Sequence, residues 1–138
     1  MIRVRFFLYN IANFDYIQQL DYLKCEYPES RCYHTCNYYH KFNSVYIIGG
    51  WNGNISDLNK DKFTYVWKLV FINIGFYWEK IEVITDKENC DPKTISRRGH
   101  TSDLLNDKIY VFGGIKGYNL KSNELLILTL IDSEVSIY

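Results

Sequence analysis

Apolar residues in this chain of 138 residues occur in short runs that polar stretches separate. The runs are rich in Ile, Val, Tyr and Phe, which favour the extended backbone of a strand over a helix. In the middle of the chain, this pattern predicts four strands, at residues 34–39, 45–48, 66–74 and 77–84.

Polar residues and glycine predict the connections between these strands. Residues 41–44 form a turn, residues 52–62 a long loop, and Gly75 a second turn. After a further loop at residues 85–96, the apolar run at 125–131 favours another strand over a partner helix. Four strands joined in order predict an up-and-down antiparallel sheet. A sheet this small cannot bury both of its faces alone, so it must stack on similar units.

Two motifs recur in one order, and they indicate an internal repeat. The pattern Arg-x-x-His-Thr begins at Arg31 and again at Arg97, 66 residues later. Each copy precedes an apolar run that ends in a glycine pair, with Tyr three positions before the first glycine. The repeated residues are Arg31, His34, Tyr46, Gly49 and Gly50 in the first copy, and Arg97, His100, Tyr110, Gly113 and Gly114 in the second.

A third similarity extends the repeat to the N-terminus. Residues 9–16 resemble residues 72–78, which end in Trp78, and a fainter copy at 128–130 has no Trp after it. The chain is therefore predicted to contain the end of one unit, a whole unit and most of another. These are residues 1–24, 31–84 and 97–138, respectively.

Charge, hydrophobicity and cysteine content restrict the class of protein. Lys and Arg balance Asp and Glu at a formal net charge of zero, which argues against binding nucleic acid or a membrane surface through bulk charge. A hydrophobic content of 47% excludes a disordered chain. Polar residues interrupt the apolar N-terminal stretch before it could form a signal peptide or a membrane span. We therefore expect a cytoplasmic or nuclear protein whose cysteines (Cys25, Cys32, Cys36 and Cys90) are reduced.

Over nearly its whole length, the sequence resembles the kelch-repeat family of β-propellers. The resemblance rests on the two Arg-x-x-His motifs, the two Tyr-x-x-Gly-Gly motifs and Trp78. It implies an all-β fold, a partial propeller of about two and a half four-stranded antiparallel blades. The chain departs from the family in its long period, which extended loops at 51–65 and 85–96 cause. Propellers close with about four to eight blades. The open edges of so few blades therefore predict self-association.

The repeated residues are expected to serve the structure of each unit. The glycine pairs permit positive φ and close backbone approach, and Trp78 supplies a large apolar body between sheets. The Arg and His residues recur in step with the repeat, which favours a structural role over a catalytic one for each of them.

The resemblance also implies a binding surface around the propeller axis. Its residues follow each glycine pair or lie between the Arg and the His, namely Tyr33, Trp51, Asn52, Arg98, Ile115 and Lys116. Tyr33, Trp51 and Arg98 are of the types that dominate protein interfaces, although Trp51 could instead pack under its own loop. The expected function is a non-catalytic protein-interaction module without a cofactor. Within the family, the segment 5–83 is most similar to substrate receptors of cullin-type ubiquitin ligases that recognise protein C-termini.

Two other functions compete with this interpretation. Cys32, His34 and Cys36 alternate along one predicted strand with His40 beyond, which suggests a zinc-stapled domain. However, ligands along one extended strand lie too far apart for one ion, so Cys32 and Cys36 are expected to be small core residues of an inner strand. The second competitor is an oxidase-like kelch enzyme with Tyr, Cys and His ligands to copper. No pair of His residues remains for copper, and no nucleophile elbow or phosphate-binding loop is present.

Overall fold

The structure is a computed structural model and describes residues 27–57, 65–73, 75–81, 83–85, 95–131 and 134–137. Within these residues the chain is all-β, as the sequence predicts, and contains two short 3-10 turns but no α-helix. The described strands form three sheets and do not close into a barrel. No helix in this part of the chain is long and apolar enough to span a membrane.

The first sheet has four antiparallel strands in chain order, as predicted. They are β1 (Thr35–Tyr39), β2 (Ser44–Ile48), β3 (Val66–Ile72) and β4 (Gly75–Ile81). A 3-10 turn, η1 (His40–Phe42), connects β1 to β2 and ends at Asn43, whose φ of 44° is left-handed. Asn tolerates this conformation better than most residues, so the turn forms where the polar stretch predicts it.

The second sheet has five strands in the order β5-β12-β11-β8-β7. Its strands are β7 (Thr101–Leu105), β8 (Lys108–Phe112), β11 (Leu125–Ile131), β12 (Glu134–Ile137) and β5 (Val83–Thr85). All neighbours are antiparallel except β5 and β12, which are parallel. The run at 125–131 is thus a strand, as predicted, and β12 follows it although no Trp is present there.

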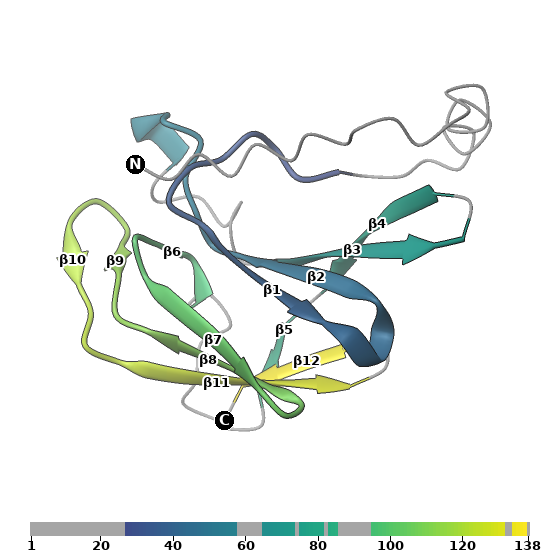
Figure 1. Cartoon of the computed structure of the whole chain (residues 1–138). Coiled ribbons are helices and arrows are strands. Elements are labelled where there is room, and N and C mark those ends of the chain that lie inside the picture. The colour runs from purple at the N-terminus through teal and green to yellow at the C-terminus, as the bar shows by residue number, and fades with distance from the viewer. Residues whose placement is uncertain are drawn as a thin grey trace.

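A small third sheet joins β6 (Arg97–Arg98), β9 (Ile115–Lys116) and β10 (Leu120–Lys121) in the order β10-β9-β6. Because β6 precedes β7 and β9 follows β8, this sheet lies beside one end of the second sheet (Figure 1). The second 3-10 turn, η2 (Ile55–Asp57), lies in the segment after Trp51.

The core lies between the first and second sheets, which are stacked one above the other in Figure 1. From the first sheet it receives Tyr39, Tyr46, Ile48, Val66 and Ile81, and from the second Val83, Ile109, Val111, Leu126, Leu128 and Leu130. Because side chains alternate along a strand, the other face of the first sheet carries a separate cluster. Its buried members are Val45, Ile47, Trp67 and Leu69. Each of the two sheets thus buries a face that it could not bury alone.

Two strand predictions are wrong in their bounds. The predicted strand 77–84 is not one strand, because β4 ends at Ile81 and Val83–Thr85 pairs with β12 in the second sheet. An apolar run gives no indication of which sheet its residues join, so this change of partner is invisible in the sequence. The predicted strand 66–74 ends at Ile72, and Gly75 already pairs with Ile72 as the first residue of β4.

Trp78 packs edge-on against Trp67, with ring centroids 6.5 Å apart and an interplanar angle of 89°. Both rings belong to the cluster on the face of the first sheet that points away from the second sheet. Trp78 therefore does not lie between the two described sheets. The predicted partial unit at 1–24 lies outside the described residues.

Candidate functional site

Each Arg-x-x-His motif is bound to the glycine pair of its own repeat. Nη1 of Arg31 donates to the carbonyl of Gly49 at 3.0 Å, and Nη1 of Arg97 donates to the carbonyl of Gly113 at 2.8 Å. Arg97 is almost completely buried, and its Nη2 also pairs with Oε2 of Glu124 at 3.1 Å. The recurring arginines therefore hold the end of the second strand of each repeat in place.

The second glycine of each pair lies against the His of the same repeat. A Cβ added to Gly50 would be 2.9 Å from Cβ of His34, and one added to Gly114 would be 2.9 Å from Cβ of His100. Both glycines also have positive φ, 100° and 89°. No other residue type fits both conditions without strain, so the two motifs form one structural device in each repeat.

The first glycine pair additionally binds the next repeat. The Gly50 N–H donates to the Arg97 carbonyl at 2.8 Å, and the Gly99 N–H donates to the Tyr33 carbonyl at 2.9 Å. A Cβ at Gly49 would be only 2.2 Å from the Arg97 carbonyl oxygen. The absence of a side chain at Gly49 is what lets the two repeats come this close.

Alternate side chains of β1 continue this contact along the neighbouring strand β7 and the residues just before and after it. Oγ1 of Thr35 shares a hydrogen bond of 2.7 Å with Nε2 of His100. The hydroxyl of Ser102 donates to Oδ1 of Asn37 at 2.7 Å, and the hydroxyl of Tyr39 donates to Oδ1 of Asp107. We call these three side-chain pairs, together with the backbone bonds of Gly50 and Gly99, the seam.

His100 is neutral at physiological pH because of its position in the seam. Burial lowers the pKa of its imidazole to about 4, and the nearby Arg97 guanidinium and His34 ring act in the same direction. The backbone of Arg97 opposes this lowering but does not overcome it. Burial and the Arg31 charge also lower the pKa of His34. Each histidine lies beside the arginine of its own repeat, His100 beside the buried Arg97 and His34 beside the half-buried Arg31, which favours a structural role for both.

A small hollow opens beside the seam, between the segment that follows β2 and the third sheet. It is lined by Gly50, Trp51, Ser96, Arg97, Arg98, Ile115 and Gly117, and its volume is about 220 Å³ including its open mouth. Its enclosed volume is only about 10 Å³, about the room of one water molecule, so the hollow is a shallow surface feature and not a pocket for an organic ligand.

Trp51 and Arg98, two of the predicted contact residues, both line this hollow and lie next to each other. The Arg98 guanidinium carbon lies 5.3 Å from the centroid of the Trp51 ring, within cation–π range. Arg98 is fixed there because Nη1 donates to the Gly117 carbonyl at 2.7 Å and Nη2 to the Tyr118 carbonyl at 2.9 Å. Two backbone carbonyls therefore hold the Arg98 guanidinium beside the indole.

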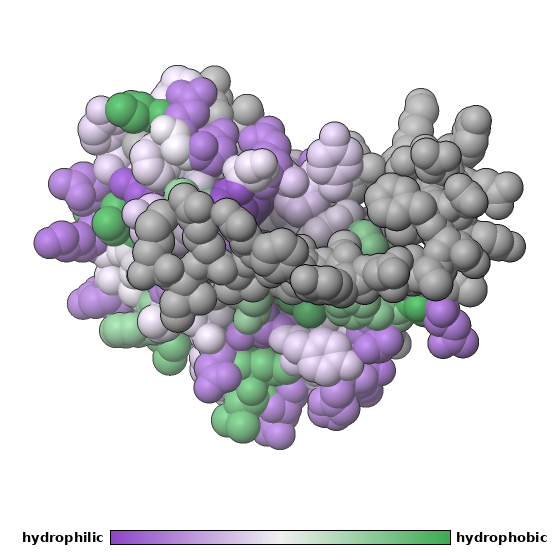
Figure 2. Space-filling model, turned by 45° about the horizontal axis from the view of Figure 1, so that its top comes forward, coloured by the Kyte–Doolittle hydropathy of each residue, from purple (hydrophilic) through white to green (hydrophobic). Residues whose placement is uncertain are grey.

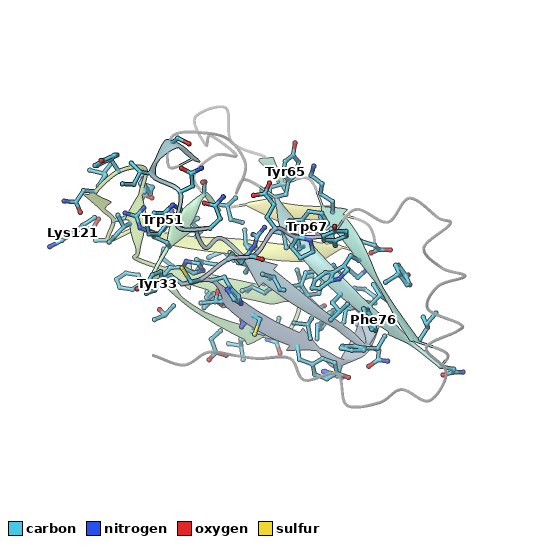
Figure 3. The ribbon with its side chains drawn as sticks, turned by 90° about the horizontal axis from the view of Figure 1, so that it is seen from above. Tyr33, Trp51, Tyr65, Trp67, Phe76 and Lys121 are labelled. Carbon is cyan, nitrogen blue, oxygen red and sulfur yellow. The ribbon has the colours of Figure 1, made fainter. Side chains whose placement is uncertain are left out.

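Trp51 also contacts its own loop. Its Nε1 donates to the carbonyl of Asn54 at 2.9 Å, and its backbone forms an isolated bridge with Cys32. Packing under its own loop and lining a surface are thus both true of Trp51, because its loop orients a half-buried indole that still lines the hollow. Figure 3 shows Trp51 and Tyr33 toward the same end of the molecule as Lys121, and Trp67 and Phe76 toward the other end.

Three other predicted contact residues, Tyr33, Asn52 and Lys116, do not line the hollow. Tyr33 is 59% exposed and has a φ of 57°. The side chain of Asn52 faces Glu29, with 3.5 Å between Nδ2 and Oε2, whereas Nζ of Lys116 pairs with Oε1 of Glu124 at 2.9 Å. The hydrogen bond from Lys116 lowers the pKa of Glu124, although burial acts in the opposite direction. Lys116 is therefore committed to an internal ion pair.

Sequence reasoning missed two groups of residues. The first is Tyr118, 62% exposed, whose carbonyl holds Arg98. Its neighbour Gly117, with a φ of 52°, was the available signal for a tight turn at this point. The second group is the acceptors and donors of the seam, Asn37, Ser102 and Asp107, which differ from their repeat equivalents and so carry no repeat signal. Figure 2 shows single apolar residues among hydrophilic ones over the left of the molecule, where Figure 1 places β9 and β10.

The zinc hypothesis assumed that Cys32, His34 and Cys36 alternate along one strand, and the structure contradicts this. Tyr33, with its positive φ, interrupts the extended backbone, and β1 begins only at Thr35. Cys32 is exposed, with its Sγ 3.2 Å from the Trp51 carbonyl, so the prediction that it is a core residue is wrong. Cys36 is half-buried against the Trp67 cluster, and burial raises the pKa of its thiol. Within the described residues, no three His, Cys, Asp or Glu side chains gather as a metal site would require. Cys25 and Cys90 lie outside those residues.

Two comparisons with known proteins gave no match. No protein-family model matches the sequence, and no curated protein matches it. The kelch resemblance therefore rests on the sequence motifs alone.

Proposed function

We propose that the chain is a kelch-type propeller portion that binds a protein partner at the hollow between its two repeats. The observation that carries this proposal is the meeting of Trp51 and Arg98. One follows the glycine pair of the first repeat and the other belongs to the Arg-x-x-His motif of the second, yet both line the same hollow. A surface assembled from two repeats is what a propeller presents around its axis.

Residue type and exposure favour a protein as the partner. The backbone carbonyl of Tyr118 binds Arg98 and that of Tyr33 binds its neighbour Gly99, and the side chains of these two tyrosines are 62% and 59% exposed. Tyr, Trp and Arg are the residues that most often dominate binding energy in protein interfaces. The formal net charge of zero implies recognition by shape and local contacts.

Stacking of the two sheets supports the propeller part of the proposal. Each repeat fixes its own glycine pair through its arginine, and the first repeat then receives the Arg97 carbonyl of the second at Gly49. The inner strands β1 and β7 lie next to each other along the seam. This is the relation expected between neighbouring blades.

The binding proposal is tested by quantitative affinity capture with the whole chain. Trp51→Ala and Arg98→Ala should each remove the same bound proteins, with losses of about tenfold or more, because hot-spot truncation costs about 2 kcal/mol or more. Ile72→Ala is the matched control, since Ile72 is 40% exposed on β3 and does not line the hollow. Capture that is equal for all three variants and the parent chain, with unchanged melting temperatures, contradicts the proposal.

The family resemblance extends the proposal to a substrate receptor of a cullin-type ubiquitin ligase. A protein whose capture depends on Trp51 should then have a longer cellular half-life when this chain is depleted or when cullin activation is inhibited. A half-life that neither treatment changes removes the ligase part and leaves the interaction module.

A further inference from the structure

The second sheet has one face in the core and one face open to solvent. On the open face, Leu105 of β7, Phe112 of β8 and Leu125 of β11 are 61%, 53% and 54% exposed. The register places Phe112 directly between Thr101 and Leu125, and Tyr110 between Asp103 and Ile127. We call this surface, with Lys108 at its third row beside Leu105, the open face.

The equivalent face of the first sheet is covered. Tyr39, Tyr46 and Ile48 occupy the positions that Leu105, Tyr110 and Phe112 occupy in the second repeat, and they are 1%, 1% and 0% exposed. They are buried because the second sheet packs on them. A face of this composition therefore does become an interface within this molecule when a sheet is available to cover it.

Head-to-tail stacking of a second copy on the open face would use the far face of the first sheet of that copy. The middle of that far face, Val45, Ile47, Trp67 and Leu69, is already buried, with exposures of 4–7%. The open face of a second copy has no such cover, so it is the better surface for the contact.

The open face is complementary to itself in charge. Asp103 and Lys108 are exposed on it, and within the described part of the chain neither forms an ion pair. A two-fold axis allows Asp103 of one copy to lie near Lys108 of the other. A formal net charge of zero leaves no long-range repulsion between copies.

We propose that two copies of the chain associate face to face through the open face, with Leu105, Phe112 and Leu125 as the exposed apolar side chains that the contact buries. Apolar exposed faces rimmed by polar residues are typical of interaction sites, and closed two-fold dimers are the commonest homo-oligomers. This dimer does not depend on the proposed partner site, which lies at the hollow.

The test is sedimentation of the whole chain over a concentration series. The expected result is a dimer, with twice the monomer mass of 16.5 kDa. Phe112→Lys and Leu125→Lys should each give a monomer, while Leu120→Lys, at a side chain 65% exposed in the third sheet, should leave the dimer intact. A parent chain that stays monomeric at about 100 µM, where a contact with micromolar Kd would be nearly saturated, overturns the proposal.

Charge reversal tests the two-fold arrangement and needs no apolar substitution. Asp103→Lys and Lys108→Asp should each weaken the dimer about tenfold, by placing like charges near each other, and the double variant should restore it. Open-ended assemblies, which head-to-tail stacking produces, would overturn the proposal. So would a dimer that neither apolar substitution breaks, or a double variant that remains as weak as the singles.

Discussion

The two glycine pairs have the same sequence setting but different surroundings, and the difference separates two roles of one motif. Both pairs are held by the arginine of their own repeat and lie against its histidine. Gly49 then receives the Arg97 carbonyl of the next repeat, at 2.2 Å from where a Cβ would lie. At Gly113 the nearest atom is the Ser122 carbonyl oxygen, at 3.4 Å. The motif therefore fixes a strand end in both repeats and docks a neighbouring sheet in one.

The largest predicted effect exploits this contrast directly. Gly49→Ala should lower the free energy of unfolding by about 2–5 kcal/mol, since Ala would have to adopt the left-handed φ of 59° that Gly49 has and its Cβ would press against a backbone carbonyl. Gly113→Ala has only the cost of a left-handed φ of 72°, because a Cβ there would lie at an ordinary contact distance from its nearest neighbour, the Ser122 carbonyl oxygen. Its expected loss is about 1–2 kcal/mol. Urea unfolding measures both, and a Gly113→Ala loss as large as that of Gly49→Ala is incompatible with the docking role.

The pH dependence of stability sharpens the comparison between the two histidines. With a folded pKa of about 4 against 6.5 for the unfolded chain, His100 makes the unfolded state bind more protons between these values. The stability that the neutral imidazole of His100 gives the folded state is fully present above about pH 6.5 and is lost as the pH falls through 4. The total is on the order of 3 kcal/mol.

The control for this effect is a variant without the titrating group. His100→Gln should flatten the unfolding free energy between pH 4 and 6.5, whereas His34→Gln should flatten it less. The pKa of His34 is lowered too, so its contribution has the same sign. Parallel curves for the parent chain and His100→Gln would show that the imidazole is not desolvated in the seam.

A smaller effect is expected from the hydroxyl groups of two adjacent tyrosines. Tyr39→Phe removes the bond to Asp107 across the seam and should lower the free energy of unfolding by about 1–2 kcal/mol, as for a hydrogen bond to a charged group. Tyr38→Phe removes an exposed bond to Asn43 within the first repeat and should change it by less than about 0.5 kcal/mol. If urea unfolding gives equal losses of stability for Tyr39→Phe and Tyr38→Phe, the Tyr39 hydroxyl makes no stabilising contact between the sheets.

The sequence predicts more of each repeat than of the contact between repeats. The apolar runs and glycine pairs define the strands of the first sheet, because local propensity and burial act in the same direction there. The partner of residues 83–85 could not be predicted, since an apolar strand can pair in either sheet. The seam residues Asn37, Ser102 and Asp107 could not be predicted either, because they differ from their repeat equivalents and are paired only by the fold.

The candidate site shows the same limit. Trp51 and Arg98 follow from their positions relative to the repeated motifs, and they do meet. Lys116 occupies a comparable position, but Glu124, eight residues further along the chain, binds its ammonium group at 2.9 Å and 3.0 Å. Position in a repeat thus predicts where a side chain lies, whereas its availability depends on neighbours that the repeat does not specify.

Amide hydrogen exchange at Gly50 and Gly99 tests the stacking of the two repeats most directly. Both N–H groups donate across the seam, to the Arg97 and Tyr33 carbonyls, and neither belongs to a strand ladder. The stacking predicts that these two amides exchange as slowly as those in the interior of β2 and β8, through opening of the whole structure. Exchange of Gly50 and Gly99 at the rate of an exposed loop, with β2 and β8 still protected, would contradict it.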